Sequence, residues 1–165
     1  MSNEERSRPG AARSWITALR RYALFMGPAN LAWETLQVPL YTIWRDGTIG
    51  EIAFSVVHCT AGDLLIALAC LGAALILLGD ASWPGEGSLR VALAAVAFGL
   101  AYTMYSEWLN VAVRESWAYS PRMPVVPPLD TGLSPLLQWL LLPPVGLSWA
   151  GRRVGAARGR KLADR

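Results

Sequence analysis

Long apolar segments alternate with short polar connections along this chain, and the pattern predicts four membrane-crossing helices. The apolar segments cover residues 22–44, 52–78, 89–113 and 134–150, close to the ~20 residues that cross a bilayer core. The connection at 114–133 is long and Pro-rich, which is typical of a lid or binding loop. The pattern therefore predicts an all-α integral membrane bundle of four transmembrane helices.

Proline positions predict how the first and last helices are shaped. Pro28 and Pro39 are expected to kink the first helix and Pro143-Pro144 to break the fourth, because proline removes a backbone donor and crowds the preceding turn. Ser134-Pro135 has the pattern of an N-cap followed by proline at the first helical position.

Charge is concentrated at the two ends of the chain. Hydrophobic residues make up 53% of the sequence, charged residues 16%, and the net charge is +3. Residues 1–21 and 151–165 are rich in Arg, whereas the connections after the first and third segments contain only Arg45, Arg114 and Arg122. By the positive-inside rule both termini are cytoplasmic. Basic tails beside apolar segments suit a lipid bilayer as partner, and no motif indicates nucleic acid.

Three further expectations concern the ends of the chain and its cysteines. The start is predicted to be disordered, with a short interfacial helix from about Ser14, and no signal peptide is expected. Cys59 and Cys70 fall on one helix, roughly 16 Å apart along its axis, so they cannot form a disulfide with each other. Trp44 and Trp117 are expected to mark the outer interface.

Polar residues on the first segment follow a helical spacing. Asn30, Glu34, Gln37 and Tyr41 are separated by steps of four, three and four, which places them on one helical face. Gln138 is expected to enter from the fourth helix at a shallower level.

The second and third segments carry polar faces of their own. An ionised carboxylate that faces lipid costs several kcal/mol, so these faces should turn inward toward a wet cavity that opens to the outside. The residues concerned are Ser55, His58, Cys59 and Asp63 on the second segment, and Thr103, Glu107 and Asn110 on the third.

Two segments of the chain resemble each other. Residues 34–44 and 107–117 share Glu, Leu, Val and Trp at equal spacing. Both would run outward, so the similarity indicates a parallel repeat of two helical hairpins, with chance resemblance as the alternative.

The buried ionisable residues are the candidates for chemistry, because such residues in membrane segments usually mark function. Glu34, Glu107, His58 and Asp63 are the candidate catalytic residues of an acid–base membrane enzyme. A metal-dependent version would use His58, Glu34 and Glu107 as ligands, although the Glu-x-x-His signature of di-iron bundles is absent.

Other interpretations stay open at this point. His58 and Cys59 with Met123 could hold a soft metal such as copper(I). A small proton-coupled transporter would need a homo-oligomer, because four helices are few for a carrier. An assembly or partner-binding subunit would use the Trp/Tyr-rich outer loop. The amides Asn30, Gln37 and Gln138, with Thr103, fit hydrogen bonding between helices.

Several runs resemble small uncharacterised bacterial inner-membrane proteins. The resemblance covers about residues 22–150 and implies a multi-pass protein of the bacterial inner membrane, with no known activity and no assigned site residues. The runs that carry it are 58–63, 102–110, 116–120, 123–124 and 132–139.

Overall fold

The computed structural model describes residues 3–79, 83–85, 87–128 and 130–163, with side chains from residue 15 to residue 151 within these ranges. The chain is mostly helical, at 80%, which confirms the all-α class. The elements are α1 (Asn3–Gln37), the 3-10 helix η1 (Val38–Leu40), α2 (Ile43–Asp46), α3 (Ile49–Leu78), α4 (Ser88–Glu107), the π-helix η2 (Trp108–Val113), β1 (Val125–Val126), β2 (Thr131–Gly132) and α5 (Leu133–Ala163).

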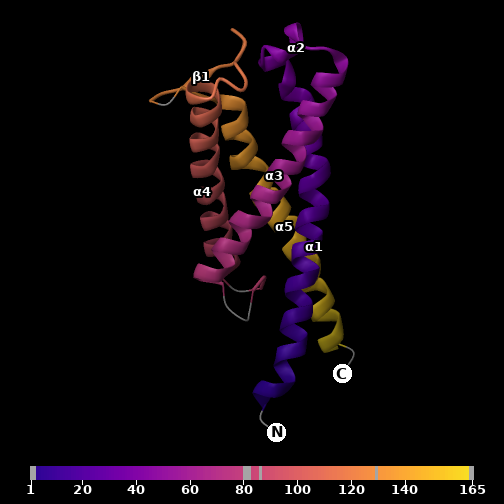
Figure 1. The fold of residues 1–165 in the computed structure, drawn as a ribbon. Coiled ribbons are helices and arrows are strands. Elements are labelled where there is room, and N and C mark those ends of the chain that lie inside the picture. Colours follow the sequence, from indigo (N-terminus) through magenta and orange to yellow (C-terminus); the bar gives the residue numbers. More distant parts are fainter. Residues whose placement is uncertain (1–2, 80–82, 86, 129, 164–165) are drawn as a thin grey trace.

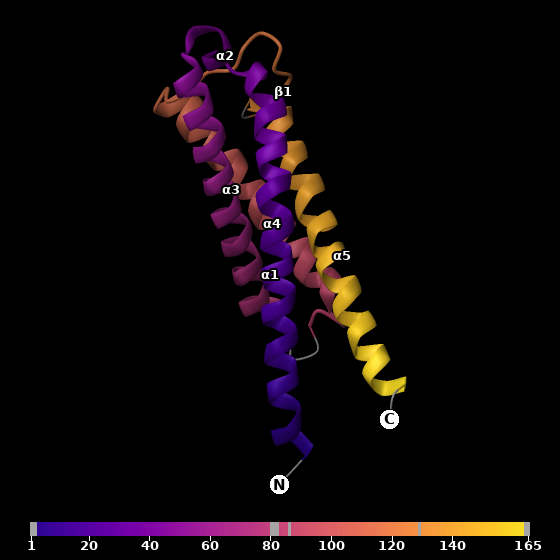
Figure 2. The same cartoon turned by 90° about the vertical axis from the view of Figure 1, so that its right-hand side faces the viewer.

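The four long helices form an up-down-up-down bundle (Figures 1 and 2). α1 and α4 each pack against both α3 and α5, so α1 lies diagonally opposite α4. Both chain ends lie at one end of the bundle, here called the terminal end, and α2 and β1 lie at the other, the loop end (Figure 1).

Two helices in the described ranges are long and apolar enough to cross a membrane. They are α3 and the continuous stretch Ser88–Val113, formed by α4 and η2. α1 contains residues 22–37 of the first predicted segment and α5 contains the fourth, and neither helix meets the same criterion. The structure therefore supports two of the four predicted spans by length and composition.

One of the proline predictions is wrong, because α5 continues through Pro143 and Pro144 and is not broken there. α1 continues as a helix through Pro28, and the kink expected there stays a prediction. Pro143 is fully buried, and packing of this kind can outweigh the loss of a backbone hydrogen bond. Pro39 lies in η1, just after α1 ends at Gln37, because a proline disfavours helical geometry in the residue before it.

The helix starts also differ from the prediction. α1 begins at Asn3, so the expected disordered start is helical, with residues 1 and 2 outside the described residues. α5 begins at Leu133, and Ser134, the expected N-cap, instead donates a hydrogen bond from Oγ to Gln37 Oε1 at 2.8 Å. The start of α3 has a capping box, in which Thr48 and Glu51 bond each other's backbone and side chain.

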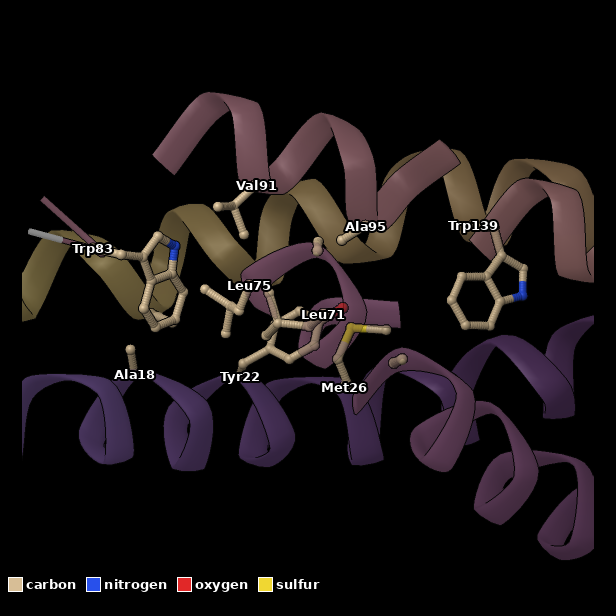
Figure 3. Close-up of a cluster of buried hydrophobic side chains, with 12 residues drawn as sticks. Ala18, Tyr22, Met26, Leu71, Leu75, Trp83, Val91, Ala95 and Trp139 are labelled. Carbon is tan, nitrogen blue, oxygen red and sulfur yellow. The ribbon is translucent and has the colours of Figure 1, made fainter. Parts of the chain in front are cut away.

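The terminal half of the bundle is filled by one apolar cluster (Figure 3). Trp139 is the member of the cluster that also lines the cavity described below, so it separates packed core from cavity. Its ring lies directly on Gly99, where a Cβ atom would come within 2.8 Å of ring atom Cζ3. The buried cluster residues include Ala18, Tyr22, Met26, Leu71, Leu75, Trp83, Val91, Ala95 and Trp139.

The connection at 114–133 is folded onto the loop end of the bundle rather than unstructured. Tyr41 and Tyr119 form an antiparallel bridge, in which Thr42 N donates to Ala118 O at 3.0 Å and Ser120 N donates to Leu40 O at 2.9 Å. β1 and β2 add a short antiparallel hairpin. The loop therefore covers the ends of α1 and α4.

The two similar segments run in the same direction but differ locally. The segment that starts at Glu34 tightens into the 3-10 helix η1, whereas the segment that starts at Glu107 widens into the π-helix η2. Both run from the terminal end toward the loop end (Figure 1). The shared direction of the two segments fits a repeat of two hairpins, and the repeat itself stays a prediction.

Candidate functional site

A cavity of about 840 Å³ lies in the loop-end half of the bundle. Its walls come mainly from α3, from the connection at 38–47 and from α4, with further residues of α1 and α5. α3 and α4 diverge toward the loop end in Figure 1. The polar faces expected on the second and third segments meet along this cavity. All seven of their residues line it: Ser55, His58, Cys59, Asp63, Thr103, Glu107 and Asn110.

Two carboxyl groups meet on one wall of the cavity. Glu34 on α1 and Asp63 on α3 both line the cavity, and both accept a hydrogen bond from Gln138 Nε2, at 3.2 and 2.8 Å. Two acids that share one donor lie close together, and two like charges so close in a buried site cannot both be ionised without a large cost. The geometry therefore favours one proton shared between the two carboxyl groups.

Amide side chains surround this carboxyl pair. Gln138 Nε2 donates to Asp63 Oδ2 at 2.8 Å, to Asn30 Oδ1 at 3.0 Å and to Glu34 Oε1 at 3.2 Å. Gln37 Nε2 donates to Glu34 Oε1 at 2.6 Å. Gln138 is 3% exposed, so its two amide hydrogens serve three acceptors without competition from solvent. The network joins α1, α3 and α5 at one level of the bundle.

Gln138 and Asn30 correct details of the expected site. Gln138 does not enter at a shallower level, since it contacts Asn30, Glu34 and Asp63 together. Ser134, one turn earlier on α5, sets this register through its bond to Gln37. Asn30 is 1% exposed, and its Nδ2 has no hydrogen-bond partner among the described residues. The amides do connect helices, and they also position the two acids.

Glu107 forms a second polar centre on α4. The Tyr119 hydroxyl donates to Glu107 Oε2 and accepts a hydrogen bond from Gly132 N at 2.9 Å. Burial, and then the bond to Glu107, raise the pKa of Tyr119 above its ordinary value. Tyr119 therefore stays a phenol and keeps its proton for Glu107. Sequence reasoning missed this contact, because only the folded loop brings Tyr119 back over the end of α4.

The helix changes its pitch directly after Glu107. Residues 108–113 form a π-helix, with Arg114 N donating to Leu109 O at 2.8 Å across five residues. Asn110 Nδ2 donates back to Ser106 O at 2.8 Å. π-Helical turns are rare and occur often at functional sites. Here the wider turn follows the one acid of α4 that lines the cavity.

Replacing Tyr119 by phenylalanine should release the loop from the bundle. Loss of a hydrogen bond to a buried carboxylate costs about 2 kcal/mol, so amide exchange at Gly132 should rise about thirtyfold. Because the folded-state pKa of Tyr119 lies above its unfolded value of about 10, its stabilising effect is complete below pH ~10 and is lost as the pH rises through the folded pKa.

Hydrogen–deuterium exchange with mass spectrometry of the peptide that contains Gly132 measures this effect. Tyr105→Phe is the matched control, because Tyr105 is 54% exposed and packs on the Trp108 ring. Equal exchange in the Tyr119→Phe variant and the unaltered chain would contradict the assigned role of the hydroxyl.

His58 lies apart from the buried acids. Its side chain is exposed at the cavity mouth and stacks on Phe54, with ring centroids 5.4 Å apart. Within the described part of the chain, no three His, Cys, Asp or Glu side chains gather closely enough to hold a metal ion. His58, Glu34 and Glu107 are therefore not brought together as the expected ligand set.

The remaining candidate residues are placed as follows. Cys59 lines the cavity and Cys70 is buried, and both are free thiols. Met123 is buried beside Gly132 and is not among the residues that line the cavity, whereas His58 is, so the structure does not group the two as a soft-metal site. Trp117 lines the cavity, whereas Trp44 is 48% exposed.

No protein-family model, curated protein or solved structure matches this chain. Its function is therefore inferred from the geometry of the cavity and the carboxyl pair.

Proposed function

We propose that the chain is a four-span protein of the bacterial inner membrane that binds a small molecule in its cavity and exchanges a proton at the Glu34–Asp63 pair. The observation that carries this proposal is the pair of carboxyl groups in the cavity wall that share the donor Gln138 Nε2. A charged or hydrogen-bonding ligand beside such a pair changes how tightly its proton is held. The pair can thus take up or release a proton as the ligand binds, or pass it to a bound substrate.

The surface of the bundle supports four spans. Large apolar side chains are exposed on α1 and α5, including Leu36 at 79% and Val145 at 54%. The interior holds the polar groups Asn30, Glu34 and Gln138 instead. Apolar residues outside and hydrogen-bonded polar residues inside suit a lipid environment, where a buried acid must face the bundle interior.

Orientation follows from the basic tails. The Arg-rich ends at 1–21 and 151–165 belong to the terminal end of the bundle. The positive-inside rule places this end in the cytoplasm and the cavity in the outer half of the membrane. The resemblance to small bacterial inner-membrane proteins supports the choice of membrane.

The structure favours binding at a one-sided site over the two other interpretations. A transporter needs a second path, but the terminal half of the bundle is filled by the packed cluster around Tyr22, Leu71 and Val91. A partner-binding loop needs outward aromatic groups, but Trp117 lines the cavity and Tyr119 bonds Glu107.

The double variant Glu34→Gln/Asp63→Asn tests whether the carboxyl pair holds a proton. The two substitutions keep side-chain size and remove both carboxyl groups. The unaltered chain, in lipid nanodiscs at neutral pH, should show an infrared band of a protonated carboxyl group that shifts in deuterium oxide. The double variant should lack this band. The control Glu115→Gln should retain it, because Glu115 is an exposed acid that is not among the residues lining the cavity.

The same samples test ligand binding. Nanodiscs formed from the bacterial membrane should retain a molecule that mass spectrometry finds enriched with the unaltered chain and with Glu115→Gln, but not with the double variant. A missing carboxyl band, or an identical set of retained molecules in all three samples, would overturn the proposal.

A further inference from the structure

The cavity has an unbalanced set of charged groups. Five acidic side chains line it, and none of its described lining residues is Lys or Arg. The three most buried of these acids have neutral hydrogen-bond donors as partners: Glu34 and Asp63 accept from Gln138, and Glu107 accepts from Tyr119. A cation in the cavity would therefore meet acids that have no Lys or Arg partner among the described lining residues. The five acids are Glu34, Asp46, Glu51, Asp63 and Glu107.

The cavity also opens sideways between α3 and α4. Phe54 on α3 is 68% exposed and Tyr102 on α4 is 45% exposed, yet both line the cavity. Residues that meet both conditions mark its mouth, which also reaches the loop end, because Asp46, Gly50, Glu51 and Ser116 meet them too. The lateral part of the mouth lies between the two helices that are long and apolar enough to cross a membrane, so it faces lipid in the proposed orientation. Aromatic faces at a mouth attract cations and also contact alkyl chains.

The depth and the size of the cavity suit a polar head group with a hydrocarbon chain attached. The floor is Trp139, which lies between the cavity and the packed cluster. A volume of about 840 Å³ is within the range of ~300–1,000 Å³ that is typical of small-molecule sites. A head group at Glu34 and Asp63 would leave its chain to pass over Phe54 and Tyr102.

We propose that the cavity binds the head group of a cationic amphiphile, a long-chain amine, which enters from the outer leaflet between α3 and α4. This inference rests on the proposed function and specifies its ligand. The positive head group takes the acidic interior, and the hydrocarbon chain stays in the bilayer against the aromatic mouth.

Spin-labelled octadecylamine tests this assignment in nanodiscs of phosphatidylcholine that contain the full chain. Electron paramagnetic resonance measures the fraction of label immobilised by the protein. The amine should associate about tenfold more strongly than spin-labelled octadecanol, because a buried acid attracts a cation far more than a hydroxyl group. Spin-labelled stearic acid, at a pH where it is ionised, should associate less than the alcohol.

Two pairs of variants locate the binding. Glu34→Gln/Asp63→Asn should reduce amine binding to the level of the alcohol, and Glu115→Gln should not. Gly62→Leu should also abolish the preference, because Gly62 lines the cavity and a Cβ there meets nothing within 4 Å, so the larger side chain fills the cavity without a clash. Gly72→Leu is its control on the same helix, with equally open space and no place in the cavity wall.

Several outcomes would overturn the inference. Equal association of the amine and the alcohol would show that the cavity does not select a cationic head group. If butylamine displaced the label as readily as octadecylamine does, the ligand would be a water-soluble amine and not an amphiphile. A preference that survives Gly62→Leu would place binding elsewhere. If the carboxyl band and the retained molecule behave as expected, but the amine associates no more strongly than the alcohol, the proposed function is supported and the cationic amphiphile is rejected as its ligand.

Discussion

Replacing Gln138 by leucine should lower the free energy of unfolding by about 3 kcal/mol, the largest effect expected for this chain. The side chains have similar volume, so the change mainly removes the donor. Asn30, Glu34 and Asp63 each lose a hydrogen bond from Gln138 Nε2, at 3.0, 3.2 and 2.8 Å.

The magnitude depends on which acceptors are left behind. A hydrogen bond between helices in a membrane contributes about 0.6 kcal/mol on average, which would sum to only about 2 kcal/mol for three bonds. Two of the acceptors here belong to a carboxyl pair that carries a charge, and bonds to charged groups are roughly twice as strong. The larger value is therefore expected.

Unfolding in mixed detergent, followed by circular dichroism, measures this difference. Thr35→Val is the matched control, because Thr35 is exposed and its hydroxyl donates to Leu31 O in its own helix at 2.7 Å. Asp63→Leu should lower the free energy of unfolding less in the Gln138→Leu variant than in the unaltered chain, since the two side chains share one hydrogen bond. A loss below about 0.6 kcal/mol for Gln138→Leu would show that the amide is an ordinary interhelical contact.

Gly99→Ala should destabilise the bundle by about 1–2 kcal/mol, although the same change usually stabilises a helix. The new Cβ atom would overlap the Trp139 ring, with ring atom Cζ3 at 2.8 Å and Cδ2 at 3.2 Å. Trp139 is 4% exposed and is held between the core cluster and the cavity, so its rigid ring cannot move without disturbing one of them.

Gly72→Ala supplies the comparison in the same unfolding experiment. Gly72 lies inside α3, and a Cβ there meets nothing within 4 Å, so the substitution should raise the free energy of unfolding by up to about 1 kcal/mol. Trp139→Leu should lower the free energy of unfolding less in the Gly99→Ala variant than in the unaltered chain, because it removes the overlap between the ring and the new methyl group. Equal effects of Gly99→Ala and Gly72→Ala would disprove the tight contact.

Gly99 also connects stability with the proposed ligand site. Because Trp139 lines the cavity, a methyl group on Gly99 that pushes the ring away from α4 changes the shape of the cavity floor. Binding of the spin-labelled amine should therefore fall in Gly99→Ala. This separates a packing effect at the floor from the charge effect of Glu34 and Asp63.

Much of the candidate site was predictable because helical periodicity does not depend on distant contacts. The spacing of Asn30, Glu34 and Gln37 places them on one face, and the structure buries all three. The polar faces that include Asp63 and Glu107 likewise meet at a cavity. The cost of exposing polar groups to an apolar environment decides which way such faces turn.

The expected metal set illustrates what periodicity cannot decide. His58 shares a helical wedge with Asp63, yet its side chain stacks on Phe54 at the mouth, while Asp63 accepts a hydrogen bond from Gln138. A wedge of one helix is wide enough to contain both an interior and a surface position. Only the packing of α1 and α4 against α3 determines which of the two positions a residue takes.

The sequence by itself determined the helical class, the segregation of charge to the tails and the polar faces, because each depends on local spacing and on the cost of burying charge. The tertiary structure alone decided which groups meet. It brought Gln138 to the Glu34–Asp63 pair, returned Tyr119 to Glu107 through a folded loop, and kept α5 helical through Pro143 and Pro144. These contacts join residues distant in sequence or depend on packing between helices, and no local pattern specifies the register in which helices and loops pack.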